Sequence, residues 1–327
     1  MEHGYDLIII GSGPAGLSAA IYAQRARLDT LVIEKDMVSG GQVLTTYEVD
    51  NYPGLPGIGG FDLGMKLREH AERLGAVFVT DQVVRVEEDQ EEAGETGEGE
   101  LLKAAELAPA RGMKQVICGS GSYRAKTVLI ATGAAHRKLG VEGEERLTGM
   151  GVSYCATCDG AFFRNKEVAV VGGGDVALED AIFLSRMCSK VWLIHRRDEF
   201  RGAKSLQENV FRQENIRILW DTTVEEIQGE QAVEGLRIRN KKTQEESILK
   251  VQGVFIAVGI TPNSRAFDGL VEMEDGYIRA GEDTRTSVPG IFAAGDVRTK
   301  ALRQIVTAAA DGANGVTAVE RYLAGEG

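Results

Sequence analysis

Two cysteines stand three positions apart in the segment Cys155-Ala156-Thr157-Cys158. A pair at this spacing, particularly at the start of a helix, can close a small redox disulfide and lower the pKa of one thiol. A zinc site is the alternative, but it needs two more ligands. Cys118 and Cys188 are isolated, and the four histidines do not cluster near the pair. We therefore expect redox chemistry, no metal site, and ordinary buried thiols at Cys118 and Cys188.

Asp159 follows the second cysteine directly. A carboxyl group at this position can exchange a proton with the thiolate that forms when the disulfide opens. An aspartate that caps a turn is the alternative interpretation. The candidate catalytic residues are therefore Cys155, Cys158 and Asp159.

A glycine-rich loop lies near the N-terminus. The segment Gly11-Ser12-Gly13-Pro14-Ala15-Gly16 follows the apolar run 7–10 and precedes a helical pattern. Glycines at these places allow a tight turn and let a pyrophosphate approach the N-terminus of the helix. Glu34 falls at the end of the next apolar run, where an acidic side chain can accept hydrogen bonds from a ribose diol. The loop predicts FAD or NAD binding; a merely tight turn is the alternative.

A second loop, Gly172-Gly173-Gly174-Asp175-Val176-Ala177, repeats the pattern with alanine in the third glycine place. The position equivalent to Glu34 begins the run His195-Arg196-Arg197, and Arg201 follows one helical turn later. Guanidinium groups in place of a carboxylate suit a ribose that carries a 2′-phosphate, because arginine pairs with phosphate oxygens bidentately. This predicts NADPH binding; the alternatives are NAD and an exposed basic helix start.

The two loops belong to an internal repeat. Residues 5–35 align without a gap with residues 166–196, and each segment reads as a buried strand, a glycine turn, a helix and a second strand. The predicted fold class is α/β, with two Rossmann-like nucleotide-binding domains, one for FAD and one for NADPH. Strand-like runs at 127–131 and 253–258 mark the crossings between domains. The second domain (136–259) is therefore inserted into the first (1–135 and 260–327).

Three further segments have distinct patterns. Residues 87–112 are rich in Glu and Gly without helix or strand periodicity, which is typical of a solvated loop. The runs 83–86 and 114–118 predict two strands of a small antiparallel sheet. Residues 304–323 predict an Ala-rich helix, preceded at 290–296 by a strand that runs into a turn.

The composition limits the class of protein. The chain has 327 residues, 41 glycines and a formal net charge of −12. This charge argues against nucleic acid or an anionic membrane as a partner, because both need a basic face. The N-terminus lacks the basic start of a secretory signal, and no apolar run is long enough to span a membrane. We expect a soluble cytoplasmic protein.

Longer motifs occur together and in order. They are Gly-Val-Ser-Tyr-Cys-Ala-Thr-Cys-Asp-Gly at 151–160, Gly-Gly-Gly-Asp at 172–175, His-Arg-Arg-Asp-Glu-Phe-Arg at 195–201 and Gly-Ile-Phe-Ala-Ala-Gly-Asp at 290–296. With these motifs nearly the whole chain closely resembles the low-molecular-weight thioredoxin reductases. The resemblance implies that electrons pass from NADPH to FAD, then to the Cys155–Cys158 disulfide, and finally to oxidised thioredoxin. It also implies a homodimer and a rotation between domains about the crossings near Gly133 and Gly259.

The resemblance also implies roles for individual residues. Cys158 matches the thiol that faces the flavin, Cys155 the thiol that attacks the partner disulfide, and Asp159 the proton donor. Asp296 matches the residue that binds ribitol. The expected FAD contacts are Gly11, Ser12, Gly13, Ala15, Gly16, Glu34, Gly41, Gln42, Asn51, Thr132, Gly133, Gly295, Asp296, Arg303, Gln304 and Ile305. The expected NADPH contacts are Gly172, Gly174, Asp175, Val176, His195, Arg196, Arg197 and Arg201.

Two departures and three alternatives remain. The acidic loop at 87–112 is longer than we expect for the family, which bears only on a partner surface. Residues 298–302 differ from the usual turn before the Arg-Gln pair of the family, which we expect to affect flavin contacts. A reductase for a peroxiredoxin- or glutaredoxin-like protein shares the architecture, although no extra N-terminal thioredoxin-like domain is present. A flavoprotein that passes electrons to ferredoxin is disfavoured by the cysteine pair. A non-catalytic NADPH-binding regulator would keep both loops and the redox pair without turnover, which is hard to motivate.

Overall fold

The computed structural model describes residues 3–46, 48–88 and 112–326, so most of the expected loop at 87–112 lies outside the described residues. The chain divides into two compact units. Unit 1 comprises Met1–Leu44, Gly60–Ala135 and Pro262–Gly327, and unit 2 comprises Thr45–Gly59 and His136–Thr261. The expected domain limits stay a prediction. The compact units differ from them chiefly at Thr45–Gly59, which the sequence reading left in the first domain.

A seven-stranded sheet forms the centre of unit 1. Its strands are β1 (Gly4–Ile10), β2 (Thr30–Glu34), β3 (Val77–Thr80), β4 (Val83–Glu88), β5 (Lys114–Cys118), β6 (Ser122–Ile130) and β19 (Ile291–Ala293). The order is β3-β2-β1-β6-β5-β4, and β19 also pairs with β6. Along this order β3, β2, β1 and β6 pair in parallel, and β19 pairs in parallel with β6. By contrast, β5 pairs antiparallel with both β4 and β6. The expected antiparallel pair therefore extends the main sheet instead of forming a small separate one.

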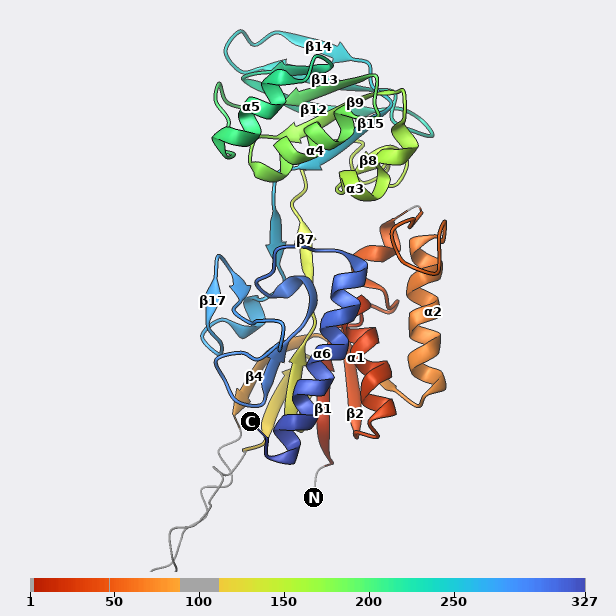
Figure 1. Ribbon diagram of the computed structural model, residues 1–327, viewed down its shortest axis with the longest axis vertical. Helices are drawn as coiled ribbons and strands as arrows, with labels where there is room; N and C mark the ends of the chain where they lie inside the picture. Colours follow the sequence, from red (N-terminus) through yellow and green to blue (C-terminus); the bar gives the residue numbers. More distant parts are fainter. Residues whose placement is uncertain (1–2, 47, 89–111, 327) are drawn as a thin grey trace, which may run out of the picture. The chain divides into compact units, whose positions relative to one another are not determined.

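Helices cover one face of this sheet. Because alternate residues of a strand point to opposite faces, each face has its own set of buried side chains. Leu7 and Ile9 pack with α1 (Pro14–Arg25) and α6 (Ile305–Ala324) in one buried cluster. These two helices lie side by side in Figure 1, α1 in red and α6 in blue. They cross closely, since a Cβ on Gly312 would lie 2.1 Å from the Ala15 carbonyl oxygen. The expected Ala-rich C-terminal helix is confirmed as α6.

The other face of the sheet packs against short elements. Ile8 and Ile10 belong to a second buried cluster with Phe267 and Ile278. The remaining elements of unit 1 are α2 (Gly60–Arg73), the short 3-10 helices η1 (Gly41–Thr45), η3 (Arg265–Phe267) and η4 (Gly295–Val297), and the hairpin strands β17 (Met273–Glu274) and β18 (Tyr277–Ile278). Where the sequence placed the two crossings, β7 (Ala134–His136) and β16 (Ile260–Pro262) pair with each other.

Unit 2 repeats the plan with a five-stranded parallel sheet in the order β11-β10-β9-β15-β8. These strands are β8 (Val152–Ser153), β9 (Glu167–Gly172), β10 (Lys190–Ile194), β11 (Ile216–Leu219) and β15 (Gly253–Ala257). Val168 and Val170 face α4 (Asp175–Ser185) and α5 (Lys204–Arg212), while Ala169 and Val171 face a three-stranded antiparallel sheet. That sheet comprises β12 (Thr222–Gln228), β13 (Gly235–Asn240) and β14 (Glu246–Leu249), and α3 (Ala156–Asp159) with η2 (Gly160–Phe163) completes the unit.

The internal repeat is confirmed as two βαβ units. In unit 1 β1 pairs in parallel with β2 across α1, and in unit 2 β9 pairs in parallel with β10 across α4. Both glycine loops therefore lie at the carboxyl end of a central strand and at the start of a helix, where open α/β sheets bind nucleotides.

We predict that Leu129→Ala lowers the free energy of unfolding by about 2–5 kcal/mol. Leu129 is fully buried between the sheet and α6, so truncation leaves a cavity that the packed helices cannot fill. The matched control is Leu302→Ala, because Leu302 is 57% exposed. Denaturant unfolding measures both variants. Equal midpoints for the two variants would contradict the placement of Leu129 in the core.

Candidate active site

The first glycine loop, Gly11–Gly16, is held by close backbone contacts. Gly11 has φ +103°, and a Cβ there would lie 2.5 Å from the Ala131 oxygen. A Cβ on Gly16 would lie 1.9 Å from the Gly11 oxygen. By contrast, a Cβ on Gly13 would meet nothing nearer than 4.0 Å, so this side of the loop is open. The loop thus presents the first turn of α1 to a ligand, as pyrophosphate binding requires.

Glu34 is fixed at the end of β2 by Ser12. The Ser12 backbone N–H and its hydroxyl both donate to Glu34 Oε2 at 2.7 Å. The backbone N–H of Asp36 donates to the other oxygen at 3.2 Å. Ser12 is fully buried, so its contribution is to orient the carboxylate that we expect to receive the ribose.

Segments from distant parts of the chain meet the first glycine loop. A Cβ on Gly41 would lie 3.3 Å from Gly13 Cα, and one on Gly295 would lie 2.9 Å from Ala15 Cβ. The structure therefore gathers most of the expected FAD contacts in unit 1, with Gln42 donating to the Ala134 oxygen. Asn51 is the exception, because it lies in the segment that groups with unit 2.

Two polar atoms in this part of unit 1 are buried without a protein partner among the described residues. They are Asp296 Oδ1 and Arg303 Nε. Burial raises the pKa of Asp296, and the positive charges of Lys300 and Arg303 counteract it. The Arg303 guanidinium lies 4.2 Å from the centre of the Tyr277 ring. Such orphaned polar atoms are rare in proteins and indicate a ligand that completes them.

The remaining expected FAD contacts have defined backbone surroundings. The Thr132 hydroxyl donates to the Asn263 oxygen at 2.7 Å, and Gly133 adopts φ +67° beside it. Gln304 precedes Ile305 at the start of α6, and its backbone N–H donates to Thr307 Oγ1 at 3.1 Å.

The second glycine loop, Gly172–Ala177, is built in the same way in unit 2. A Cβ on Gly172 would lie 2.4 Å from the Ala257 oxygen and 2.6 Å from Ala177 Cβ. Gly174 faces open space, as Gly13 does in unit 1. Position 173 also requires a glycine, because a Cβ there would lie 2.2 Å from the His195 ring.

His195 lies beneath this loop, where it is only 5% exposed. Its ring packs near Phe200 and Trp220, and its Nε2 is buried without a partner among the described residues. Burial lowers the pKa of His195, so the ring is neutral near pH 7. The structure therefore makes His195 a support of the loop with one nitrogen left for a ligand.

The three arginines of the run are exposed and carry unpaired charges. Within the described ranges, no side-chain hydrogen bond or ion pair involves Arg196, Arg197 or Arg201. The Arg201 segment is nevertheless anchored, since its backbone N–H donates to the Gly173 oxygen at 2.8 Å. Asp175 Oδ1 accepts from the Ala203 N–H at 2.7 Å and holds the same segment. Val176 is half exposed at the start of α4.

The cysteine pair forms the disulfide Cys155–Cys158 in unit 2. Cys155 precedes α3 in extended conformation, and the backbone N–H of Cys158 donates to its carbonyl oxygen at 3.2 Å. Ser153, at the end of β8, accepts the Cys155 N–H at 3.1 Å. The expected redox pair is thus present as a disulfide on a tightly hydrogen-bonded turn.

Asp159 directly follows the second cysteine of the disulfide and is partly buried. Its Oδ2 accepts from the Ser153 hydroxyl at 2.6 Å, while Oδ1 has no partner among the described residues. Burial raises the pKa of Asp159, and the Ser153 hydrogen bond partly offsets the rise. The Asp159 side chain makes no capping hydrogen bond to η2, the turn that it precedes. The alternative interpretation, an aspartate that caps this turn, is therefore wrong. A raised pKa makes this carboxyl group a better proton donor and acceptor than an ordinary aspartate.

The other two cysteines, Cys118 and Cys188, form no disulfide. Cys118 and Cys188 are buried, and burial raises the pKa of each to about 11, so both stay protonated. In the part of the chain that the structure describes, no group of three or more His, Cys, Asp or Glu side chains is arranged to hold a metal.

The sequence analysis did not identify two residues near the redox turn, Glu144 and Ser153. Glu144 is buried and accepts the Tyr154 hydroxyl at 2.8 Å together with the backbone N–H groups of Leu139 and Gly140. Ser153 joins Cys155 to Asp159. Ser153 and Tyr154 both lie inside the quoted motif 151–160, so a signal existed for them, whereas nothing in the sequence singles out Glu144.

Comparison with known proteins adds to this geometry. The sequence profile of the pyridine nucleotide-disulphide oxidoreductases matches residues 5–312. The chain is 46% identical over 324 residues to a thioredoxin reductase of Listeria monocytogenes, covering 98% of this chain and 95% of the relative. It is 44% identical to that of Bacillus subtilis, covering 98% and 96%. The solved thioredoxin reductase structure from Streptococcus pyogenes is similar, with a TM-score of 0.88, 43% identity and 99% of each chain covered.

The chain therefore belongs to the pyridine nucleotide-disulphide oxidoreductase family. The resemblance to the thioredoxin reductases is confirmed, and with it the α/β fold of two Rossmann-like domains. It is an NADPH-dependent disulfide oxidoreductase that uses FAD and NADPH. The residues present fit both cofactors: Asp296 and Arg303 leave orphaned atoms in unit 1, and unit 2 offers three unpaired guanidinium groups.

We predict that Ser153→Ala raises the pKa of Asp159 further, because the variant loses the one side-chain hydrogen bond that favours the ionised form. The carboxylic acid then persists to higher pH than in the parent protein. The infrared C=O band of the acid, followed against pH and assigned with Asp159→Asn, measures this. Ser264→Ala is the control, since Ser264 is equally buried but donates to the Gly276 oxygen in unit 1. An unchanged midpoint in Ser153→Ala would contradict the prediction.

Proposed function

We propose that this chain reduces the disulfide of thioredoxin with electrons from NADPH. The observation that carries the proposal is the Cys155–Cys158 disulfide followed by Asp159, whose Oδ1 has no partner among the described residues. Both lie in the same unit as the three unpaired arginines. Relatives that cover nearly the whole chain bear the name thioredoxin reductase, which supports thioredoxin as the partner.

The chain's own residues divide the work. FAD, when bound, would supply the two-electron chemistry that links NADPH to the Cys155–Cys158 disulfide. Breaking the Cys155–Cys158 bond takes up these two electrons, and Asp159 supplies a proton to the Cys158 sulfur. Cys155 then attacks the disulfide of thioredoxin and forms a mixed disulfide. Cys158 returns its proton to Asp159 and attacks Cys155, which restores the internal disulfide and releases thioredoxin. The two thiolates of thioredoxin take up one proton from Asp159 and one from solvent, so electrons and protons balance.

The proposal keeps the cofactor contacts that the sequence predicts. Glu34, oriented by Ser12, receives the adenosine ribose of FAD, and Asp296 receives the ribitol. The exposed Arg196, Arg197 and Arg201 receive the 2′-phosphate of NADPH. Among the described residues these arginines have no carboxylate partner, which supports this, because an unpaired guanidinium can pair with a phosphate.

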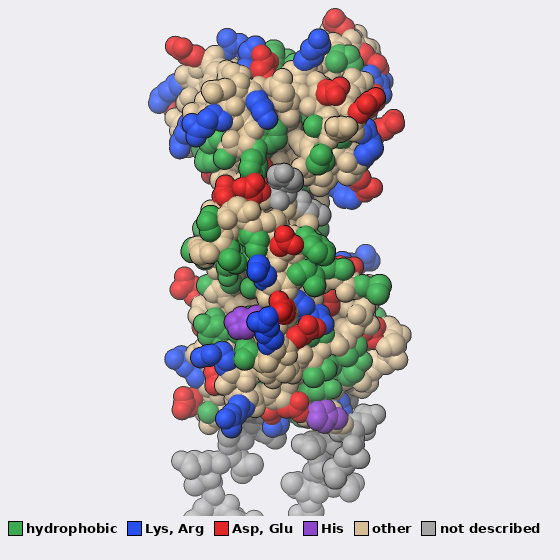
Figure 2. Space-filling view, turned by 90° about the vertical axis from the view of Figure 1, so that its right-hand side faces the viewer, with side chains coloured by type: hydrophobic (Ala, Val, Ile, Leu, Met, Phe, Trp, Pro, Cys, Tyr) green, Lys and Arg blue, Asp and Glu red, His purple; other side chains and the backbone are tan. Residues whose placement is uncertain are grey.

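A finer proposal concerns assembly and location. We propose a cytoplasmic homodimer that binds neither nucleic acid nor membranes. Phe61 and Met65, one turn apart on α2, are 53% and 41% exposed, which supports a contact of unit 1 with a second copy. Figure 2 shows hydrophobic side chains among mixed charges on the face that carries α2. No helix in the described ranges is long and apolar enough to cross a membrane.

We predict that Cys155→Ser abolishes thioredoxin reduction, because the attacking thiol is lost. NADPH still bleaches the yellow flavin of this variant anaerobically, but oxidised thioredoxin does not restore the colour. Cys118→Ala is the control and keeps both steps. Full thioredoxin reduction by Cys155→Ser would overturn the dithiol route and favour direct electron transfer from the flavin.

We predict that Arg197→Ala and Arg201→Ala each raise the KM for NADPH by about 10- to 100-fold, the range of a lost charge-assisted hydrogen bond. The KM for NADH changes little, because NADH lacks the 2′-phosphate. Arg212→Ala is the matched control, since Arg212 is an exposed arginine on α5 that faces Glu208. Equal changes for both nucleotides would show that these arginines do not read the phosphate.

A further inference from the structure

A buried cluster of charges lies beside Asp296 in unit 1. It consists of Arg298, Lys300 and Asp311, which we call the Asp311 cluster. Their side chains are only 6–7% exposed. Arg298 and Lys300 belong to the turn that departs from the family pattern, and Asp311 comes from the middle of α6. Burial of three charges is costly unless they pair closely, so the geometry of the cluster is informative.

Asp311 accepts four hydrogen bonds. The Arg298 guanidinium donates to both carboxylate oxygens, from Nη2 at 2.7 Å and from Nε at 2.8 Å. Lys300 Nζ donates at 2.9 Å, and the backbone N–H of Gly295 also donates at 2.9 Å. Burial alone would raise the pKa of Asp311, but the hydrogen bonds from Arg298 and Lys300 outweigh it and the pKa is lowered. Asp311 is therefore ionised and saturated with donors.

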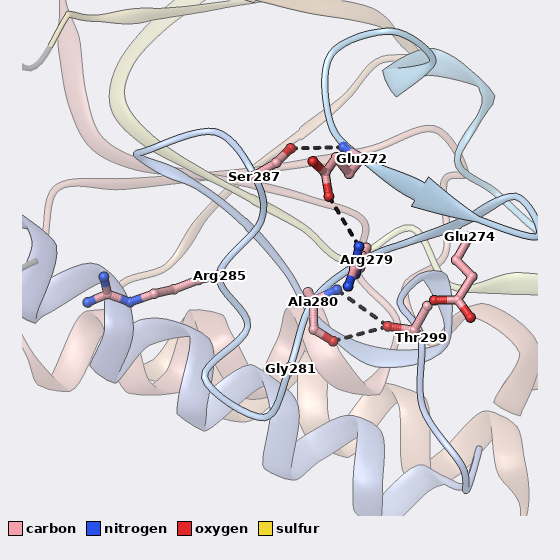
Figure 3. A pocket seen from close by; sticks show the side chains of 8 residues that line it. All are labelled: Glu272, Glu274, Arg279, Ala280, Gly281, Arg285, Ser287 and Thr299. Atoms are coloured by element: carbon pink, nitrogen blue, oxygen red, sulfur yellow. Dashed lines mark hydrogen bonds and ion pairs between the residues drawn. The ribbon is translucent and has the colours of Figure 1, made fainter.

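Arg298 also links the cluster to the segment that follows β18. Its Nη1 donates to the Ala280 oxygen at 3.2 Å and to the Thr299 oxygen at 2.9 Å. The Thr299 hydroxyl also donates to the Ala280 oxygen, as Figure 3 shows. The pocket of about 420 Å³ drawn there shares Ala280 and Thr299 with this network, but contains none of the expected cofactor contacts. All partners of Arg298 are thus in place without a ligand.

The charge balance of the cluster points to Asp296. Arg298 and Lys300 carry two positive charges, and Asp311 supplies one negative charge. Asp296 is the next carboxylate, and the field of Lys300 and Arg303 opposes the rise that burial imposes on its pKa. Its Oδ1 is the orphaned buried oxygen of this region. The cluster therefore both fixes Gly295, the residue before Asp296, and supplies a countercharge to the Asp296 carboxylate.

We propose that Asp311, with Arg298 and Lys300, is the positioning device that holds the Gly295–Asp296 turn in the form that binds the ribityl chain of FAD. This rests on the proposed FAD site. Asp311 is a positioning residue, because its four hydrogen bonds are all to protein groups. Its effect on the flavin passes through the Gly295 N–H bond and through the charge of Lys300.

The test uses the full chain, freed of flavin and titrated with FAD. Asp311→Asn keeps the shape but loses the charge that holds two buried cations. We expect its Kd for FAD to rise about tenfold or more, because removing one partner of a buried ion pair is strongly unfavourable. At saturating FAD, the visible circular dichroism of the bound flavin changes, which a mere loss of stability does not produce. Lys126→Met, which removes an exposed ion pair with Asp6 in the same unit, is the control and changes neither readout.

Lys300→Met is the second variant, in case Asp311→Asn does not fold. It leaves the Arg298–Asp311 pair intact and removes only the second cation. We expect a weaker effect in the same direction, about threefold in Kd, with altered flavin circular dichroism. Far-UV circular dichroism and NADPH binding to unit 2 show which variants are folded. Parent-like Kd and spectrum in the folded variants overturn the proposal, whereas a parent chain that binds no FAD would contradict the proposed function instead.

Discussion

Both nucleotide sites depend on backbone atoms approaching more closely than a side chain allows. A Cβ on Gly11 would lie 2.5 Å from the Ala131 oxygen, and one on Gly172 would lie 2.4 Å from the Ala257 oxygen. The same contact, between a glycine loop and the end of a neighbouring strand, recurs in the two halves of the internal repeat. A side chain at either place would push the loop away and displace the first turn of the following helix from the strand ends.

The buried carboxylates around the sites fall into two groups. Glu144 and Asp311 are saturated by donors from the protein and hold local structure in place. Asp159 and Asp296 each keep one oxygen without a partner among the described residues. Leaving a buried oxygen unpartnered is costly, and such atoms occur where a group is bound or transformed. The two incomplete carboxylates are the ones that the proton donor and ribitol assignments require.

The two units also differ in how they present positive charge. In unit 2 the arginines after β10 are exposed and have no ion-pair partner in the part of the chain that the structure describes, which suits an anion that arrives from solvent and leaves again. In unit 1 Arg298 and Lys300 are buried and paired with Asp311. This suits a cofactor that stays bound, because the countercharge is fixed before binding and costs no rearrangement.

The sequence by itself determined the elements and their chemistry. The continuous apolar runs in β1 and β9, the two glycine loops and the cysteine pair depend on neighbours a few positions apart. These local patterns predicted the repeat, both nucleotide sites and the redox disulfide. The tertiary structure decided what depends on distant residues. His195 lies against Gly173 as a neutral support of the second glycine loop. The Ser153 hydroxyl donates to Asp159, which does not cap the turn that follows it. Asp311 accepts hydrogen bonds from Arg298 and from the Gly295 N–H. An isolated aspartate in an Ala-rich helix carries no periodic or motif signal, so only the packing of α6 against η4 reveals what it does.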